Sequence, residues 1–220
     1  MAKVSGKSVL VAGATGLVGR EIVAALLANK TNRVIHCIGR RPLVLKHPRL
    51  QSHVVDFAAL PILPKIDECY IALGTTIKVA GSQAAFRLID LDAVVAVAKA
   101  AQLAGATRFG VVSAMGANAQ SRVFYSRTKG EMELALINIG LQSLVIARPS
   151  FLDGDRKALK QPERRGEGFG LMLTRGLRSF IPMNYRVILA KDVAKALIQA
   201  VQAEKPGVVT LLSGEMQGRQ

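Results

Sequence analysis

The sequence contains few of the residues that build disulfide scaffolds, metal sites and aromatic binding surfaces. It has no Trp, only 5% aromatic residues and two cysteines among 220 residues. Cys37 and Cys69 both lie in apolar runs, and two thiols are too few for a disulfide framework or a structural zinc site. The three histidines lack the spacing of helical metal-ligand pairs, so we expect no metal site. This cysteine usage fits a reducing compartment, and we expect a cytoplasmic protein.

Long apolar runs are also lacking. Charged residues such as Arg20 and Lys99 interrupt every stretch that approaches the length of a bilayer span, so we expect no membrane-spanning helix. The segment from Met1 to Lys7 is too short for a signal or transit sequence, and we expect an unprocessed chain.

Acidic residues are scarce beside basic ones, 15 against 30, which gives a formal net charge of +15. Such a charge attracts anions and raises nucleic acid as a partner. Nucleic-acid reader motifs and strands with stacking aromatic residues are missing, so we expect no nucleic-acid partner. Half of the residues are apolar and 20 are Gly, a composition that excludes disorder and collagen and fits one folded domain.

The chain does contain short apolar runs that alternate with longer segments of helical period. This is the pattern of a parallel sheet with helices on both faces. Strands are expected at Ser8 to Ala12, Arg33 to Gly39, Ser52 to Val55, Glu68 to Leu73, Arg108 to Ser113 and Ser143 to Arg148, and helices from Gly16 onward, at Ser82 to Ala104 and at Phe124 to Ile139. We therefore predict an α/β fold, a doubly wound parallel sheet of the Rossmann type, in a single domain over residues 1–220.

The segment from Ser150 to Tyr185 breaks this rhythm. It is rich in Gly, Arg and Lys, with one short helix-like run at 169–177. We expect residues 150–186 to form the substrate loop or lid, while its basic cluster at 156–165 reads best as a solvated loop. A helix at 192–203 and a short strand at 208–212 complete the domain.

A glycine-rich turn joins the first expected strand to the first expected helix. Gly13 permits a tight turn, Gly16 lets the backbone approach a pyrophosphate, and Gly19 lets the helix pack closely on the strand. The alternative is an ordinary glycine-rich turn, but the order of strand, turn, helix and strand favours a dinucleotide site. Cofactor contacts are expected from Gly13, Thr15, Gly16, Leu17, Val18 and Gly19.

Two arginines end the second strand, where NAD-binding chains usually place an acidic residue for the ribose 2′-hydroxyl. Guanidinium groups of Arg40 and Arg41 can bind a 2′-phosphate, so we predict that NADP(H) is preferred over NAD(H). Arg20, just past the third glycine, can add to that pocket. Alternatively, these arginines only end a strand in a chain with many basic residues.

Further polar groups follow the third and fourth strands. Asp56 can accept a hydrogen bond from the adenine amino group, Gly74 lets the backbone approach the cofactor's ribose, and Thr75 can donate to a phosphate. Each also reads as a turn residue, but the carboxyl ends of strands are where open α/β sheets bind ligands.

A tyrosine and a lysine open the helix that follows the fifth strand. Tyr125 and Lys129 are four residues apart and so share one helix face. A carbonyl that receives hydride needs a proton donor, and a lysine ammonium stabilises the tyrosinate that results. Ser113, at the end of the fifth strand, can reach the same substrate oxygen. We predict Ser113, Tyr125 and Lys129 as catalytic residues. The alternative is that Tyr125 and Lys129 only form a pair on the protein surface.

These motifs resemble the short-chain dehydrogenase/reductase superfamily in its atypical or extended branch, through the glycine turn, the serine with Tyr-x-x-x-Lys, and Arg148-Pro149 at the end of the sixth strand. Residues 39–41, 55–57, 73–76, 125–131 and 192–194 are similar to the Tat-interacting-protein oxidoreductases. The resemblance implies an NADP(H)-binding Rossmann fold with Tyr125 as the acid or base. It also implies cofactor contacts from Phe57, Leu73, Tyr125, Lys129, Arg148 and Pro149.

One departure concerns the proton relay. Many superfamily members supply an Asn from the long helix before the fifth strand, and this chain offers Asp90 and Asp92 there. The sequence leaves open whether either takes part.

The sequence thus predicts an NADP(H)-dependent oxidoreductase that moves a hydride between the cofactor and a small carbonyl or alcohol. The alternative is a regulatory protein that senses NADPH and acts through a protein partner with little turnover. Such sensors typically lose the catalytic tyrosine, whereas this chain keeps Tyr125. The substrate, and whether the chain forms a homodimer or binds a protein partner, stay open.

Overall fold

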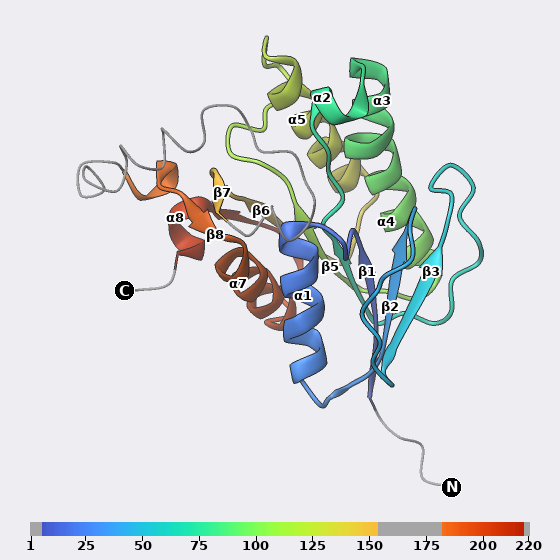
Figure 1. Cartoon of the computed structure of the whole chain (residues 1–220). Coiled ribbons are helices and arrows are strands. Elements are labelled where there is room, and N and C mark those ends of the chain that lie inside the picture. Colours follow the sequence, from blue (N-terminus) through green and yellow to red (C-terminus); the bar gives the residue numbers. More distant parts are fainter. Residues whose placement is uncertain (1–5, 154–181, 218–220) are drawn as a thin grey trace, which may run out of the picture.

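A seven-stranded parallel sheet forms the centre of the computed structural model, which describes residues 6–153 and 182–217. Its order is β3-β2-β1-β4-β5-β6-β9 (Figure 1). The strands are β1 (Lys7–Ala12), β2 (Asn32–Gly39), β3 (Leu50–Val54), β4 (Glu68–Ile71), β5 (Arg108–Val112), β6 (Ser143–Arg148) and β9 (Gly207–Leu212). The strand order reverses between β1 and β4, as in a doubly wound sheet. The predicted fold class is confirmed, and the expected last strand joins this sheet at its edge.

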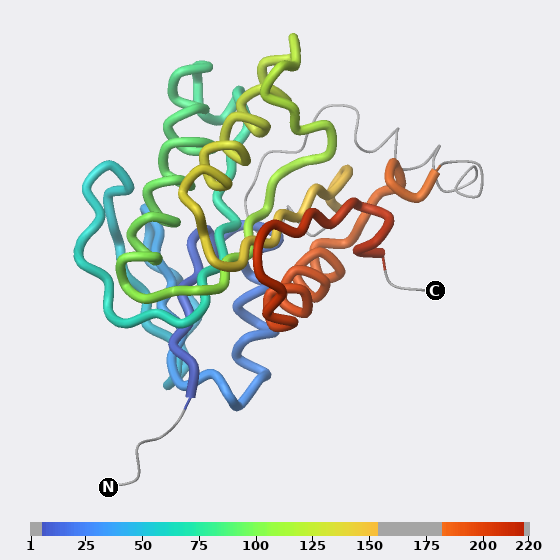
Figure 2. Tube along the Cα trace, turned by 180° about the vertical axis from the view of Figure 1, so that it is seen from behind, coloured from blue at the N-terminus to red at the C-terminus, as the bar shows by residue number. Residues whose placement is uncertain are grey.

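Two helix layers cover the sheet. Helices α1 (Leu17–Ala28) and α7 (Ala190–Gln202) lie on one face, and α4 (Ala93–Leu103) and α5 (Phe124–Asn138) lie on the other (Figures 1 and 2). Strand β1 shows why: Val9 and Val11 pack with α1 and α7, while Leu10 and Ala12 pack with α4 and α5. Because side chains alternate along a strand, each apolar strand feeds both cores.

The expected single helix over 82–104 is interrupted. It consists of α3 (Gln83–Arg87), a π-helical turn η1 (Leu88–Asp92) and α4. Ser82 caps the start, since its hydroxyl accepts a hydrogen bond from Ala85 N–H at 3.0 Å. A π turn holds one extra residue, which rotates the side chains that follow, and such turns recur at functional sites. This one contains the buried Asp90.

Short elements complete the described chain. They are α2 (Ile77–Ala80), the paired strands β7 (Leu152–Asp153) and β8 (Ile188–Leu189), a 3-10 turn η3 (Met183–Tyr185) and α8 (Ser213–Met216). Most of the expected substrate loop, including the short helix at 169–177, lies outside the described residues. Within residues 6–153 and 182–217, no helix has both the length and the apolar character needed to cross a bilayer.

Gly130 sets how closely α5 approaches the loop before it. A Cβ atom at Gly130 would stand 2.1 Å from the Ala119 nitrogen and 2.2 Å from the Asn118 carbonyl carbon. Both atoms are backbone and cannot move aside cheaply. The missing side chain therefore lets α5 lie against residues 118–119.

We expect Gly130→Ala to lower the free energy of unfolding by about 1–3 kcal/mol, because the new methyl group overpacks against backbone. Urea denaturation measures this. Gly39→Ala is the matched control: its Cβ would meet Arg41 O at an ordinary 3.5 Å, so a change within about 0.5 kcal/mol is expected. Equal stability of the two variants would contradict the steric argument.

Candidate functional site

The glycine turn after β1 is tight because two of its glycines have no room for a side chain. Gly13 has φ +89°, and a Cβ there would lie 2.4 Å from the Ala72 carbonyl oxygen, just past β4. At Gly19 a Cβ would lie 2.0 Å from the Gly13 oxygen. These contacts draw the start of α1 against the ends of β1 and β4, as the sequence predicts for the first and third glycines.

The N-terminus of α1 is ready to receive an anion. Gly16 is the N-cap and has no side chain to accept the first amide hydrogens, and Leu17, Val18 and Gly19 bring no acidic group to the first turn. At Gly16 a Cβ would make only ordinary contact with the turn, 3.4 Å from Gly13 O. Free N–H groups and a helix dipole at a glycine turn fit a dinucleotide pyrophosphate.

The predicted adenosine contacts lie at the same carboxyl edge of the sheet. Arg40 and Arg41 follow β2 with exposed side chains, and within the described residues neither forms an ion pair. Asp56 follows β3, and its Oδ1 accepts a hydrogen bond from Ala58 N–H at 2.9 Å, so it shapes its own turn. Phe57 is half-buried beside it. The roles of these residues toward a cofactor stay predictions.

The loop after β4 leads to the predicted catalytic lysine. Thr75 N–H donates to Asp90 Oδ2 at 2.9 Å, and Lys129 Nζ lies 2.8 Å from Asp90 Oδ1. Lys129 and Asp90 are 3% and 1% exposed. A Cβ at Gly74 would come within 3.4 Å of the same Asp90 oxygen, so the loop lies close over the pair. Asp90 therefore belongs to the site, whereas Asp92 is exposed.

The charge of Lys129 is held in place by its neighbours. Burial is the largest single effect and disfavours the ammonium, but Asp90, Tyr125 and Glu133 together outweigh it, so the pKa of Lys129 is raised above its ordinary value. Lys129 is thus a buried cation, paired with Asp90 across two helices.

Tyr125 lies half-buried on the same face of α5. Its ring packs against Phe86 of α3, with 5.7 Å between ring centroids. Lys129 lies one helical turn further along α5, and Tyr125 contributes to its raised pKa. The structure thus brings the two predicted residues to one place, beside the π turn.

Ser113 contacts a residue that sequence reasoning missed. Its hydroxyl donates to Oε1 of Glu133, which is 3% exposed. Arg148, at the end of β6, holds the same carboxylate with Nε 3.1 Å from Oε1 and Nη2 2.5 Å from Oε2. Glu133 lies four residues after Lys129 on α5, so both side chains are on the same face of the helix. That spacing could have pointed to Glu133 from the sequence. Arg148 is engaged with Glu133, and its predicted contact with a cofactor stays a prediction.

The candidate site is therefore a largely buried cluster with balanced charge, in which Arg148 and Tyr125 are partly exposed. Lys129 and Arg148 carry the positive charges, and Asp90 and Glu133 carry the negative ones. Ser113 and Tyr125 are the uncharged polar groups beside them. Such an arrangement keeps a hydroxyl pair positioned next to a cation, which suits proton transfer to a substrate oxygen.

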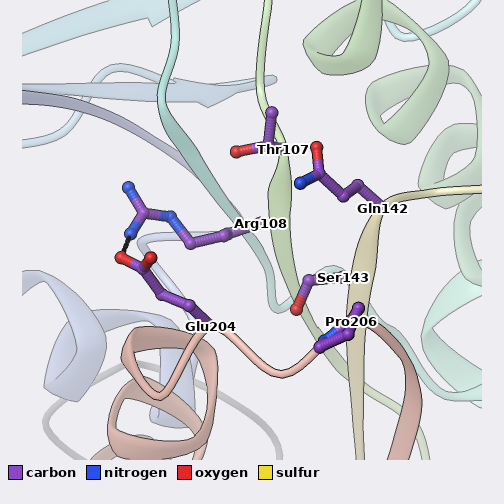
Figure 3. Close-up of a pocket in the computed structure, with 6 residues that line it drawn as sticks. All are labelled: Thr107, Arg108, Gln142, Ser143, Glu204 and Pro206. Carbon is purple, nitrogen blue, oxygen red and sulfur yellow. Dashed lines mark hydrogen bonds and ion pairs between the residues drawn. The ribbon is translucent and has the colours of Figure 1, made fainter.

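A hollow lies at the opposite edge of the sheet. It measures about 220 Å³ at the amino ends of β5 and β6 and is lined by Thr107, Arg108, Gln142, Ser143, Glu204 and Pro206 (Figure 3). Arg108 is paired there with Glu204, and also with the buried Glu68 at 3.6 Å. Since open α/β sheets bind ligands at the carboxyl ends of strands, this hollow is separate from the candidate site.

Comparison with known proteins agrees with the geometry. The NAD(P)H-binding family matches residues 13–204. The chain is 32% identical over 163 residues to the protein FMP52, mitochondrial, of Coccidioides immitis (strain RS), covering 67% of this chain and 66% of that protein. It is 29% identical over 222 residues to the protein HTATIP2 of Rattus norvegicus, covering 98% of this chain and 86% of that protein. The predicted resemblance to the Tat-interacting-protein family is confirmed, whereas the mitochondrial name of FMP52 leaves the cytoplasmic location a prediction.

Solved structures share the fold. One is the structure of MoeE5 in complex with UDP-glucose and NAD. The match covers 93% of this chain and 76% of that chain, with a TM-score of 0.69 and 20% identity. At that identity the likeness establishes the Rossmann-type architecture only.

The ion pair at the site gives a stability prediction. Asp90→Asn leaves the Lys129 ammonium buried without its carboxylate partner, which costs about 3–5 kcal/mol of unfolding free energy in comparable pairs. Urea denaturation measures the loss. Asp92→Asn removes an exposed carboxylate from the same π turn, and a change within about 0.5 kcal/mol is expected. Similar losses in both variants would refute the special role of Asp90.

Proposed function

Because the chain belongs to the NAD(P)H-binding family, we propose that it is an NADP(H)-dependent oxidoreductase of the short-chain dehydrogenase/reductase type. It transfers a hydride between NADPH and a small carbonyl compound, or in reverse from an alcohol to NADP. The single observation that carries the proposal is the chain of direct contacts from the glycine turn to the tyrosine–lysine pair.

That path consists of direct contacts. The Gly13 turn packs on Ala72, Thr75 of the same loop donates to Asp90, and Asp90 pairs with Lys129. Lys129 lies one helical turn after Tyr125 on α5. A cofactor with its pyrophosphate at the N-terminus of α1 and its ribose over the loop after β4 would thus extend toward Tyr125, which supports hydride transfer there.

The chain's own residues would handle the proton. The bound cofactor supplies or accepts the hydride. In reduction, Tyr125 donates its hydroxyl proton to the carbonyl oxygen as the carbonyl carbon receives the hydride, which leaves an alcohol and a tyrosinate. The Lys129 ammonium stabilises that tyrosinate, and solvent returns the proton afterwards. In oxidation, the tyrosinate removes the proton of the alcohol instead.

The preference for NADP(H) rests on the two arginines that end β2. Both side chains are exposed, and no carboxylate of the described chain pairs with them, so they can bind a 2′-phosphate. Arg20 is less free, since its Nε lies 3.3 Å from Glu21 Oε1. Arg40 and Arg41 are therefore the better candidates for the phosphate.

A regulatory role with little turnover is the second candidate, and one observation favours it. Asp90 neutralises the Lys129 ammonium at 2.8 Å, which weakens the field that would stabilise a tyrosinate. A protein of this kind would bind NADPH at the glycine turn and act through a protein partner. The intact Ser113, Tyr125 and Lys129 set favours the enzyme.

Turnover separates the two candidates. We expect Tyr125→Phe to lower kcat for NADPH oxidation with a carbonyl panel by at least about 100-fold, because the variant has no proton to donate. Titration calorimetry should still show NADPH binding, with Kd raised by at most about tenfold because only one hydroxyl contact is lost, and this binding shows that the variant is folded. If wild type and variant consume NADPH equally slowly with every carbonyl, the enzyme proposal fails and the regulatory one gains.

Cofactor preference has its own test. Arg40→Asp should raise KM for NADPH about tenfold or more and change KM for NADH little, since only NADPH carries the 2′-phosphate. Arg33→Asp makes the same charge change at the other end of β2, where its side chain is exposed, and should leave both KM values near wild type. An equal rise for both cofactors in Arg40→Asp would refute the assignment.

A further inference from the structure

The hydroxyl of Ser113 is already committed to a partner. It donates to Glu133 Oε1, and both residues are buried, at 6% and 3% exposure. Arg148 approaches both carboxylate oxygens of Glu133, Oε1 at 3.1 Å and Oε2 at 2.5 Å. This two-point contact with a guanidinium is the arrangement of an ionised carboxylate, which can only accept hydrogen bonds.

This commitment changes what Ser113 can offer a substrate. A serine hydroxyl has one hydrogen and two lone pairs. Because the Ser113 hydroxyl donates its one hydrogen to Glu133, the Ser113 oxygen presents only lone pairs to the open side of the site. It can then accept a hydrogen bond but cannot donate one to a carbonyl oxygen, so Tyr125 is left as the donor there.

Resting on the proposed function, we propose that Glu133, held by Arg148, is a positioning residue that fixes Ser113 as a hydrogen-bond acceptor. The substrate therefore carries a hydroxyl next to its reacting carbonyl. In a 2-hydroxy ketone the carbonyl oxygen receives the Tyr125 proton while the neighbouring hydroxyl donates to Ser113. The corresponding product is a vicinal diol, and a simple ketone lacks the donor that Ser113 accepts.

The surroundings of Ser113 favour this state over its reverse. Charged groups reach the cluster from three elements: Glu133 and Lys129 on α5, Arg148 at the end of β6, and Asp90 in the π turn. The Asp90 carboxylate is occupied by Lys129 and by Thr75 N–H, so the carboxylate that accepts the Ser113 hydrogen is that of Glu133.

A cysteine at position 113 reports this contact without any turnover. In Ser113→Cys the thiol faces the Glu133 carboxylate, which disfavours a thiolate, and the double variant Ser113→Cys with Glu133→Gln should lower the thiol pKa by about one unit or more. Thiolate ultraviolet absorbance against pH measures it. The two native thiols stay silent in the neutral range, because burial raises the pKa of Cys37 to about 12 and also raises that of Cys69.

The matched control is Ser113→Cys with Glu131→Gln, which removes a carboxylate from the same helix that pairs with Arg87 instead. No change in the thiol pKa is expected there. If the Glu133→Gln substitution unfolds the protein, Glu133→Asp keeps the charge but withdraws it from position 113, and a smaller decrease is expected. An unchanged thiol pKa on replacing Glu133 in a folded protein would overturn the positioning role.

Kinetics test the substrate class separately. For a 2-hydroxy ketone and its deoxy analogue, wild type should show kcat/KM at least about tenfold higher for the hydroxylated one, because the analogue leaves the Ser113 acceptor unmatched. Ser113→Ala should abolish that ratio, and Glu133→Gln should have little further effect in the Ser113→Ala background. No preference in an active enzyme overturns the substrate class, whereas no turnover at all refutes the proposed function and leaves the thiol titration to decide the role of Glu133.

Discussion

A buried ammonium at Lys129 imposes the central constraint on this protein. A lone cation in an apolar interior costs several kcal/mol, so the fold must bring an anion to it. Asp90, which lies in the π turn, meets that demand with Oδ1 at 2.8 Å from Lys129 Nζ on α5. Asp90 also holds the loop after β4 in place, since its other oxygen accepts a hydrogen bond from Thr75 N–H. One ion pair thus connects the loop after β4 to the helix that carries Tyr125.

The excess of basic residues has little to do with this interior. The chain carries +15, yet the cluster of Lys129, Arg148, Asp90 and Glu133 has two positive and two negative charges. Charges in a region of low dielectric interact strongly, so an unbalanced cluster would be costly, whereas exposed charges are screened by salt. The surplus therefore lies outside the cluster, and the exposed Arg40 and Arg41 are part of it.

Local sequence rules predicted much of this architecture and failed where packing between distant segments decides. The strands over 7–12, 32–39 and 143–148 are apolar enough to be recognised from composition, and the glycine turn is specified by backbone geometry alone. The π turn was missed, since nothing in an Ala-rich helical pattern marks the extra residue. Glu133 was missed for a related reason: a glutamate in a helix is normally solvated, and only the arrival of Arg148 from β6 explains its burial.

The state of Ser113 depends on a competition whose magnitudes can be compared. A hydrogen bond to a charged acceptor contributes about 1.5–3 kcal/mol, whereas one between neutral groups contributes about 0.5–1.5 kcal/mol. A neutral carbonyl that enters the site would have to draw the Ser113 hydrogen away from the ionised Glu133, exchanging the stronger bond for the weaker one. Turning the hydroxyl would also leave Glu133 Oε1 with Arg148 Nε as its remaining partner among the described residues. The Ser113 hydroxyl therefore keeps its hydrogen bond to Glu133, and the site favours substrates that bring a hydrogen-bond donor of their own.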